Sequence, residues 1–166
     1  MSRPAARRAR PATRPVRCLI DLQDHGGGMD LVEPDRIQIA VDAALARDRL
    51  RGRALGVALV APAASAALHR RHFQVGGRTD VMSFPDGTDD PETGRVRLGD
   101  LAVCPAVAVA AARRLGRRAE DEVTLYILHG VLHLLGHDDH DAQDRAAMWA
   151  EQRRCLARAG IELDQG

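Results

Sequence analysis

Apolar and polar residues alternate along the chain in blocks that predict a mixture of strands and helices. Short apolar runs bounded by turn residues predict strands at Val16–Leu22, Ala54–Val60, Thr79–Phe84 and Val96–Cys104. Longer stretches, with apolar residues three or four positions apart, predict helices that begin at Pro34 and that cover residues 62–72, 105–115, 119–135 and 141–159. The sequence therefore predicts an α+β fold, a small mixed sheet of about four strands packed with about five helices, in one domain over residues 16–166.

The last predicted helix and the polar stretch before the fourth strand lead to two further expectations. The last helix is expected to turn apolar residues toward the core, namely Ala146, Ala147, Trp149 and Leu156, and its start can be capped by Asp138 or Asp139. The stretch Asp86–Gly94 holds two glycines and four acidic residues. It is expected to be a loop.

Charge is distributed unevenly, although the formal net charge is only +1. All 24 basic residues are arginine, and residues 1–15 carry Arg3, Arg7, Arg8, Arg10 and Arg14 with no acidic residue. Such a segment has too little apolar surface to fold, so residues 1–15 are predicted to be a disordered basic tail. It can serve as an RNA-binding arm or be a solvated extension, and the sequence leaves both open.

Neither a membrane anchor nor a disulfide framework is expected. The chain contains no run of 18 apolar residues and no apolar secretory segment near its start. Cys18, Cys104 and Cys155 are odd in number and widely spaced, which is typical of buried thiols. We therefore expect a cytoplasmic protein without a membrane partner.

The helix predicted at 119–135 carries the candidate chemistry. Its segment Glu122–Leu135 is apolar on nearly every side, which is typical of a buried helix. Two histidines, His129 and His133, nevertheless lie four residues apart within it, so their side chains leave the same face. Imidazoles at this spacing can both reach a single zinc ion at about 2.0–2.1 Å. We therefore expect a metal site at the end of this helix.

A third ligand is expected just beyond the helix. Gly136 can end the helix as a left-handed cap and turn the chain back toward the histidines. A glycine at +7 and a ligand at +10 match the spacing in one class of zinc peptidases, and position +10 from His129 is Asp139. His140 follows directly, and imidazole is the more usual zinc ligand. The sequence favours Asp139 and keeps His140 as the alternative.

The residue after His129 argues against a peptidase. In the His-Glu-x-x-His enzymes that position holds the glutamate that activates water, and here it is Gly130. Three protein ligands leave the fourth position open, as in catalytic zinc sites. Zinc lowers the pKa of a bound water to about 7, which is sufficient for hydrolysis. A zinc-dependent hydrolase is therefore expected.

Three blocks of the sequence resemble the YbeY family of bacterial endoribonucleases. The segment that starts at His129 reads His-Gly-Val-Leu-His-Leu-Leu-Gly-His-Asp and resembles the family signature His-Gly-x-Leu-His-Leu-x-Gly-Tyr-Asp-His. Thr79–Pro85 resembles the family's Thr-Asp-Val-Leu-Ser-Phe-Pro strand, and Leu98–Cys104 resembles its Leu-Gly-Asp strand. The three blocks occur in the family's order and cover most of the chain after the tail.

The resemblance implies a metal-dependent, single-strand-specific endoribonuclease that matures the 3′ end of 16S ribosomal RNA and acts in ribosome quality control. Its partners would be the ribosomal RNA precursor and the small ribosomal subunit. Two of the family's three histidine ligands fall on His129 and His133, and the third falls on Asp139. The family often has an arginine where this chain has Phe73, so Arg70, Arg71 or Arg78 would contact the phosphates instead.

Two questions stay open at the level of the sequence. A proton shuttle can come from His137, Asp138 or His140, and His137 is the residue we name for it. The alternatives to a nuclease are a non-catalytic ribosome-assembly factor with a structural zinc ion and a metallopeptidase whose base lies elsewhere. A fourth protein ligand would favour the first alternative, because structural zinc sites are closed.

Overall fold

The computed structural model describes residues 16–47, 50, 52–74, 77 and 79–164. Its sheet is built from strands β1 (Leu19–Asp24), β2 (Ala54–Leu59), β3 (Val81–Pro85), β4 (Asp89–Asp90) and β5 (Arg95–Val103). Its helices are α1 (Pro34–Arg47), α2 (Pro62–Phe73), α3 (Pro105–Leu115), α4 (Ala119–Leu134) and α5 (Ala142–Arg158), with a short 3₁₀ helix η1 (Met29–Leu31). The predicted α+β class with a mixed sheet and five helices is confirmed.

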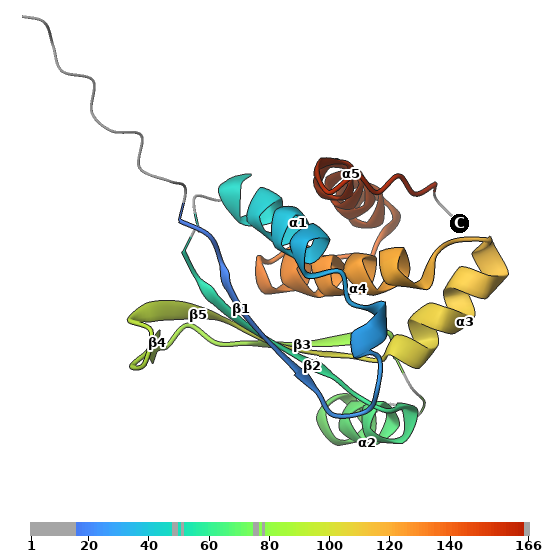
Figure 1. Cartoon of the computed structure of the whole chain (residues 1–166), viewed down its shortest axis with the longest axis horizontal. Helices are drawn as coiled ribbons and strands as arrows, with labels where there is room; N and C mark the ends of the chain where they lie inside the picture. The colour runs from blue at the N-terminus through green and yellow to red at the C-terminus, as the bar shows by residue number, and fades with distance from the viewer. Residues whose placement is uncertain (1–15, 48–49, 51, 75–76, 78, 165–166) are drawn as a thin grey trace, which may run out of the picture.

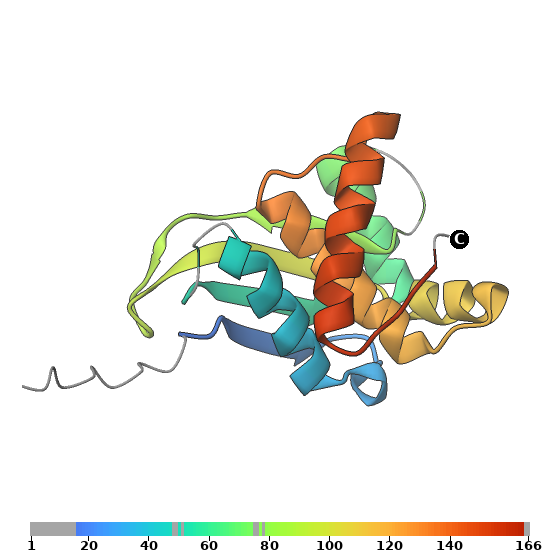
Figure 2. The same cartoon turned by 90° about the horizontal axis from the view of Figure 1, so that it is seen from above.

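The order of the strands is β1-β2-β5-β3, and β4 pairs with β5 outside this path. Strands β1, β2 and β5 are parallel, whereas β3 and β4 run antiparallel to β5. Figure 1 shows α1, α3, α4 and α5 on one face of the sheet and α2 on the other. Figure 2, seen from above, shows α4 and α5 crossing over the sheet. Helix α4 is thus enclosed between the strands and α5.

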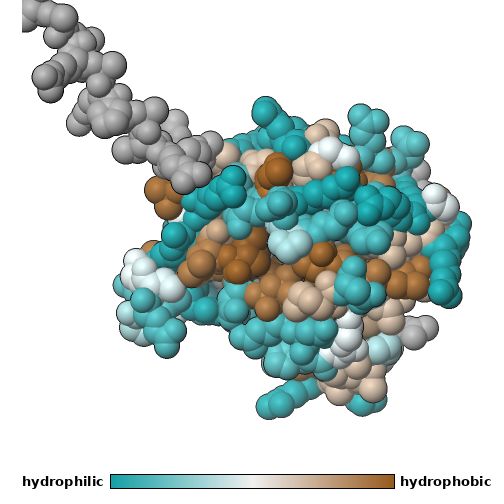
Figure 3. All heavy atoms as spheres, in the orientation of Figure 1, coloured by the Kyte–Doolittle hydropathy of each residue, from teal (hydrophilic) through white to brown (hydrophobic). Residues whose placement is uncertain are grey.

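Alternation along the strands accounts for the core. In β2, Leu55, Val57 and Leu59 point into the helix-covered core, because side chains two positions apart share a face. Helix α1 meets them with the apolar positions that the sequence predicted, among them Ile37 and Val41. In Figure 3, apolar surface gathers in a band between the helix layer and α2, where the core comes closest to the surface on this side.

Several predicted boundaries differ from the observed ones for identifiable reasons. The first strand starts at Leu19 and runs to Asp24, whose carboxylate then accepts hydrogen bonds from the amides of Gly26, Gly27 and Met29 and so fixes the turn after the strand. The predicted loop Asp86–Gly94 contains the two-residue strand β4, because the chain folds back there and Asp90 pairs with Arg95. The described sheet therefore has five strands.

The apolar face predicted for the last helix was partly wrong. Ala146 and Ala147 are exposed, and the buried positions of α5 are Met148, Glu151, Gln152, Cys155 and Leu156. Asp141 caps this helix by accepting a hydrogen bond of 2.8 Å from the amide of Asp144, so neither Asp138 nor Asp139 serves as the cap. Two polar residues thus lie on the buried side of α5.

Glu151 anchors α5 to α1 across the helix layer. Its carboxylate accepts hydrogen bonds from Arg154 and, at 2.6 Å, from Arg47 of α1. These bonds, led by that of Arg154, lower the pKa of Glu151 to about 2 despite its burial. The glutamate therefore stays ionised and paired at neutral pH, and it ties α5 to α1.

Candidate metal centre

The two histidines predicted as ligands lie on one face of α4, near its end. His129 and His133 point toward the same space, and their Nε2 atoms are 3.1 Å apart. Their side chains are 21% and 30% exposed, so the pair is partly shielded but open to a small ligand. The i, i+4 spacing thus produces the convergence expected from the sequence.

Each imidazole is oriented through its other nitrogen. Nδ1 of His129 lies 3.0 Å from Oε1 of Gln152 on α5, and Nδ1 of His133 lies 3.1 Å from the carbonyl oxygen of His137. Both partners are acceptors, so each Nδ1 carries the proton and donates it. Each Nε2 is then unprotonated and has a free lone pair. Two Nε2 lone pairs that face each other at this distance repel unless a cation or a proton lies between them.

The turn after α4 brings the third predicted ligand to the histidine pair. The amides of Gly136 and His137 bond to the carbonyls of His133 and Leu132, and Gly136 has a φ of 88°. A left-handed residue is needed here for the chain to reverse, and glycine adopts it without strain. Oδ2 of Asp139 consequently lies 3.7 Å from Nε2 of His129 and 3.9 Å from Nε2 of His133.

This donor set fits a zinc ion. Tetrahedral zinc with bonds of about 2.0–2.1 Å places its ligand atoms roughly 3.4 Å apart. The three observed separations, 3.1, 3.7 and 3.9 Å, bracket this value. Within the described residues no fourth histidine, cysteine, aspartate or glutamate joins the three in a group of mutual separation up to 4.8 Å. The arrangement offers two nitrogens and one oxygen, with room for a further ligand.

The alternative third ligand, His140, is held elsewhere. Its side chain is 87% exposed, and its Nδ1 bonds to the carboxylate of Asp138. This bond is the main reason why the pKa of His140 is raised. His140 groups with Asp138 and Asp139 but not with the two helix histidines.

Burial prepares His129 to act as a ligand. The pKa of His129 is lowered, chiefly by burial and next by the neighbouring His133, while Asp80, Gln152 and Asp139 act in the opposite direction. A lowered pKa keeps the imidazole neutral near pH 7, which is the form that binds metal.

The three cysteines are buried away from the histidines. Burial raises the pKa of Cys18 to about 12 and that of Cys155 to about 11, so these two thiols are inert.

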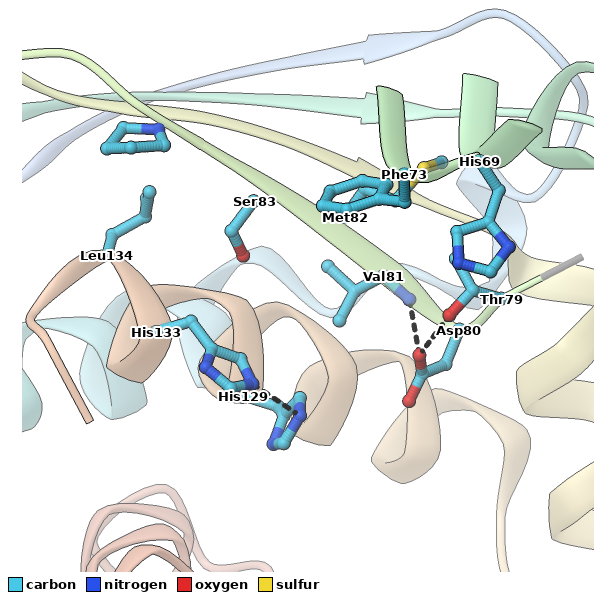
Figure 4. A pocket seen from close by; sticks show the side chains of 11 residues that line it. His69, Phe73, Thr79, Asp80, Val81, Met82, Ser83, His129, His133 and Leu134 are labelled. Carbon is cyan, nitrogen blue, oxygen red and sulfur yellow. Dashed lines mark hydrogen bonds between the residues drawn. The ribbon is translucent and has the colours of Figure 1, made fainter. Parts of the chain in front are cut away.

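A cavity of about 400 Å³ opens beside the histidines (Figure 4). It lies between the end of α2 and strand β3, and its walls are formed by His69 and Phe73 on one side and by His129 and His133 on the other. Asp80 lies at its edge with Oδ1 accepting hydrogen bonds from the Thr79 hydroxyl and the Val81 amide. These two bonds tie Asp80 to the start of β3.

The other predicted site residues lie around this cavity in different ways. Arg70 and Arg71 are exposed in the last turn of α2, the helix that ends at Phe73. Arg78 lies outside the described residues, as does the predicted basic tail 1–15. His137 contributes its backbone carbonyl to His133 and is half-buried.

Gln152 is a site residue that the sequence did not indicate. Glutamine is usually a surface residue, which is why its role was missed. The signal that could have revealed it is its spacing: Met148, Gln152 and Leu156 are four residues apart on one stripe of α5, and all three are buried. A polar residue in such a stripe needs a partner, and here the partner is His129.

Replacing Gln152 by leucine should weaken zinc binding by about 10–100-fold, which is the usual effect of losing an outer partner of a metal-ligating histidine. Leucine cannot accept the proton of Nδ1, so the imidazole of His129 loses both its orientation and its tautomer. Gln152→Glu should preserve zinc affinity, because a carboxylate accepts the same bond. The measurement is competitive titration of purified protein against a fluorescent zinc chelator.

The control for this series is Gln143→Leu. Gln143 is exposed near the start of the same helix, so its replacement should leave zinc affinity unchanged. Equal affinities for Gln152→Leu and Gln143→Leu would show that the contact with His129 has no role in metal binding.

Comparison with known proteins identifies relatives over most of the chain. The sequence profile described as Endoribonuclease YbeY matches residues 33–160. A protein named Endoribonuclease YbeY from Mycolicibacterium smegmatis is 38% identical over 136 residues, which cover 78% of this chain and 76% of that protein. One of the same name from Rhodococcus erythropolis is 37% identical with the same coverage.

The fold is also similar to a solved structure. The solution structure of TM1509 from Thermotoga maritima superposes with a TM-score of 0.59 at 22% sequence identity. The match covers 85% of this chain and 89% of that protein. It supports the α+β architecture independently of the sequence profile.

Proposed function

The chain belongs to the YbeY family of endoribonucleases, and from this premise we propose that it is a zinc-dependent enzyme that cleaves single-stranded RNA. Its substrate would be the precursor of small-subunit ribosomal RNA, with cleavage contributing to maturation of the 16S 3′ end and to ribosome quality control in the cytoplasm. The observation that carries the metal chemistry is the convergence of two Nε2 lone pairs and one carboxylate oxygen on one point.

His129, His133 and Asp139 would hold the ion, each through the atom that faces the common centre. Zinc bound there would polarise a phosphoryl oxygen and make a water acidic enough to attack at neutral pH. The protein's own contribution is orientation: Gln152 and the carbonyl of His137 fix the two imidazoles before substrate arrives. His137, half-buried beside the site, is our candidate for carrying a proton to the leaving oxygen.

Phosphate contacts would come from the arginines at the end of α2. Arg70 and Arg71 are exposed there, and the helix ends at the rim of the cavity that holds the histidines. An arginine presents a planar fork of donors that suits a phosphate group. These two residues would therefore guide the RNA backbone toward the paired histidines, together with Arg78.

Packing around Gly130 argues against a peptidase. A Cβ atom at this position would lie 2.8 Å from a methyl group of Leu101 and 2.9 Å from one of Val81. The carbonyl of Gly130 also accepts a hydrogen bond from the Ser83 hydroxyl on β3. This side of α4 packs against the sheet, so the glutamate that a His-Glu-x-x-His peptidase needs would require Leu101 and Val81 to shift.

The test is cleavage of defined RNAs by the purified protein. We expect cleavage of a single-stranded RNA that carries the unpaired 3′ end of a 16S precursor, and little cleavage of the same sequence in a duplex. Chelation should abolish cleavage, and added Zn²⁺ should restore it. Cleavage that survives complete removal of metal would contradict the proposal. So would a lack of cleavage by the zinc-loaded protein. Casein digestion, run in parallel, should be absent.

A further inference from the structure

We propose that the cavity beside the paired histidines is a subsite for one unpaired nucleobase, with the ring of Phe73 as its stacking platform. This inference rests on the proposed function, because the base would belong to the RNA strand that is cut at the histidines. It adds a recognition element to the metal site.

The place of the cavity is the first argument. Its volume of about 400 Å³ falls within the range of about 300–1,000 Å³ that is typical of small-molecule sites. Phe73 and His69 form one wall, and His129 and His133 belong to the same lining (Figure 4). A phosphate at the histidines would therefore have the base of a neighbouring nucleotide within reach of the aromatic wall.

Exposure of Phe73 is the second argument. Only 2% of the residues are aromatic, and Phe73 is one of two phenylalanines, yet this residue is 48% exposed. An aromatic ring that lines a cavity rather than the core offers a large apolar face at low entropic cost. Its free face is available to a flat apolar ligand, and the base of an RNA strand is such a ligand.

The ring is also held in position before any ligand arrives. Phe73 is the last residue of α2, and its ring lies 5.7 Å from that of His69 and 6.5 Å from that of Phe84, both at tilted angles. His69 is in turn fixed by a 3.0 Å bond between Nδ1 and the carbonyl oxygen of Gly77. A platform held in this way loses little freedom when a base stacks on it.

Two hydroxyl groups of the cavity are already engaged in hydrogen bonds within the protein. The Ser83 hydroxyl donates to the carbonyl of Gly130, and the Thr79 hydroxyl donates to the carboxylate of Asp80. They are therefore poorly placed to read the edge of a base, and recognition falls mainly to stacking, which all four bases provide. The subsite should consequently accept any base with little sequence preference.

The same geometry explains a preference for single strands. A base within a duplex is covered on both faces by its neighbours and paired along its edge, so it cannot stack on a side chain without first leaving the helix. A base in an unpaired strand can enter the cavity directly. The aromatic wall thus selects single-stranded RNA without contacting any base-specific group.

The experiment compares binding of single-stranded RNA to the zinc-loaded wild-type protein and to Phe73→Trp, Phe73→Leu and Phe73→Ala. Fluorescence anisotropy in a buffer that slows cleavage gives Kd. Stacking on one aromatic ring corresponds to roughly 5- to 150-fold in Kd. We expect Phe73→Ala and Phe73→Leu to bind more weakly by a factor in this range, and Phe73→Trp to bind at least as tightly as the wild type.

A second arm removes the base instead of the ring. Once the cleavage position is mapped, abasic residues are placed one at a time along the RNA. At one position next to the cut, the abasic RNA should bind the wild type as weakly as the intact RNA binds Phe73→Ala, and the two changes together should cost no more than either alone. Ile39→Ala, at an exposed apolar residue of α1, is the control and should behave as the wild type.

The outcomes separate this inference from the proposed function. If the wild type cleaves RNA but Phe73→Leu binds as tightly as the wild type, or if Phe73→Ala loses the same factor on every abasic RNA as on the intact one, the stacking subsite is refuted and the nuclease stands. If the zinc-loaded wild type neither binds nor cleaves single-stranded RNA, the proposed function fails and this inference fails with it. Zinc content, which should be equal in all variants, excludes loss of the metal as the cause.

Discussion

Replacing His133 by alanine should remove both the bound zinc and RNA cleavage while the protein stays folded. The substitution leaves the imidazole of His129 and the carboxylate of Asp139, and a pair of protein ligands holds zinc far more weakly than three do. The loss should exceed the roughly 10–100-fold that follows removal of an outer partner, so that protein recovered by gel filtration contains little zinc. Cleavage should fall to the background of a metal-free preparation.

The fold should tolerate this change. His133 lies in the last turn of α4 with its side chain 30% exposed, and alanine is the better helix former. Zinc content by mass spectrometry, cleavage of single-stranded RNA and the circular dichroism spectrum are the three measurements. His25→Ala, which removes an exposed histidine from the turn after β1, is the matched control and should keep both zinc and activity. Zinc and cleavage at wild-type levels in His133→Ala would show that the metal binds elsewhere.

The sequence was sufficient for the parts of the site that depend on local geometry. The pair His129 and His133 follows from one period of an α-helix, and the reversal at Gly136 follows from the backbone freedom of glycine. Both features need only neighbouring residues, and both are found in the structure. The apolar runs likewise placed the main strands and helices to within a few residues.

Contacts between distant segments were beyond such reasoning. Gln152 reaches His129 from another helix, 23 positions away along the chain. Its spacing with Met148 and Leu156 on α5 indicates a buried polar residue, but it does not indicate that the partner lies on α4. The error at Ala146 and Ala147 is related: the buried stripe of α5 contains Glu151 and Gln152, whose partners lie on other helices, and it leaves the two alanines on the exposed side. The core packing of Met148, Cys155 and Leu156 and these long-range polar contacts together fix this helix.

The two candidate third ligands, Asp139 and His140, differ in how the turn after α4 places them. Register favoured Asp139, and ligand type favoured His140. In the structure His140 is bonded to Asp138, which raises its pKa and directs it to solvent. Asp139 is left as the residue that groups with the two helix histidines. A one-residue shift of the turn would exchange these roles, so the assignment deserves a direct test.

Asp139→Ala should therefore lower zinc affinity by more than about 100-fold and suppress RNA cleavage, whereas His140→Ala should keep both close to wild-type values. The carboxylate of Asp139 lies within 4 Å of both Nε2 atoms, and an alanine leaves that side of the centre without a donor. Asp139→His supplies the missing control, because the family's third ligand is a histidine: an imidazole at this position should restore zinc binding that Asp139→Ala has lost. Competitive zinc titration and cleavage assays on the three variants measure these effects. The reverse order, in which His140→Ala loses zinc and Asp139→Ala retains it, would assign the third ligand to His140. In that case the turn must move when the metal binds, since His140 does not group with the two helix histidines in the present arrangement.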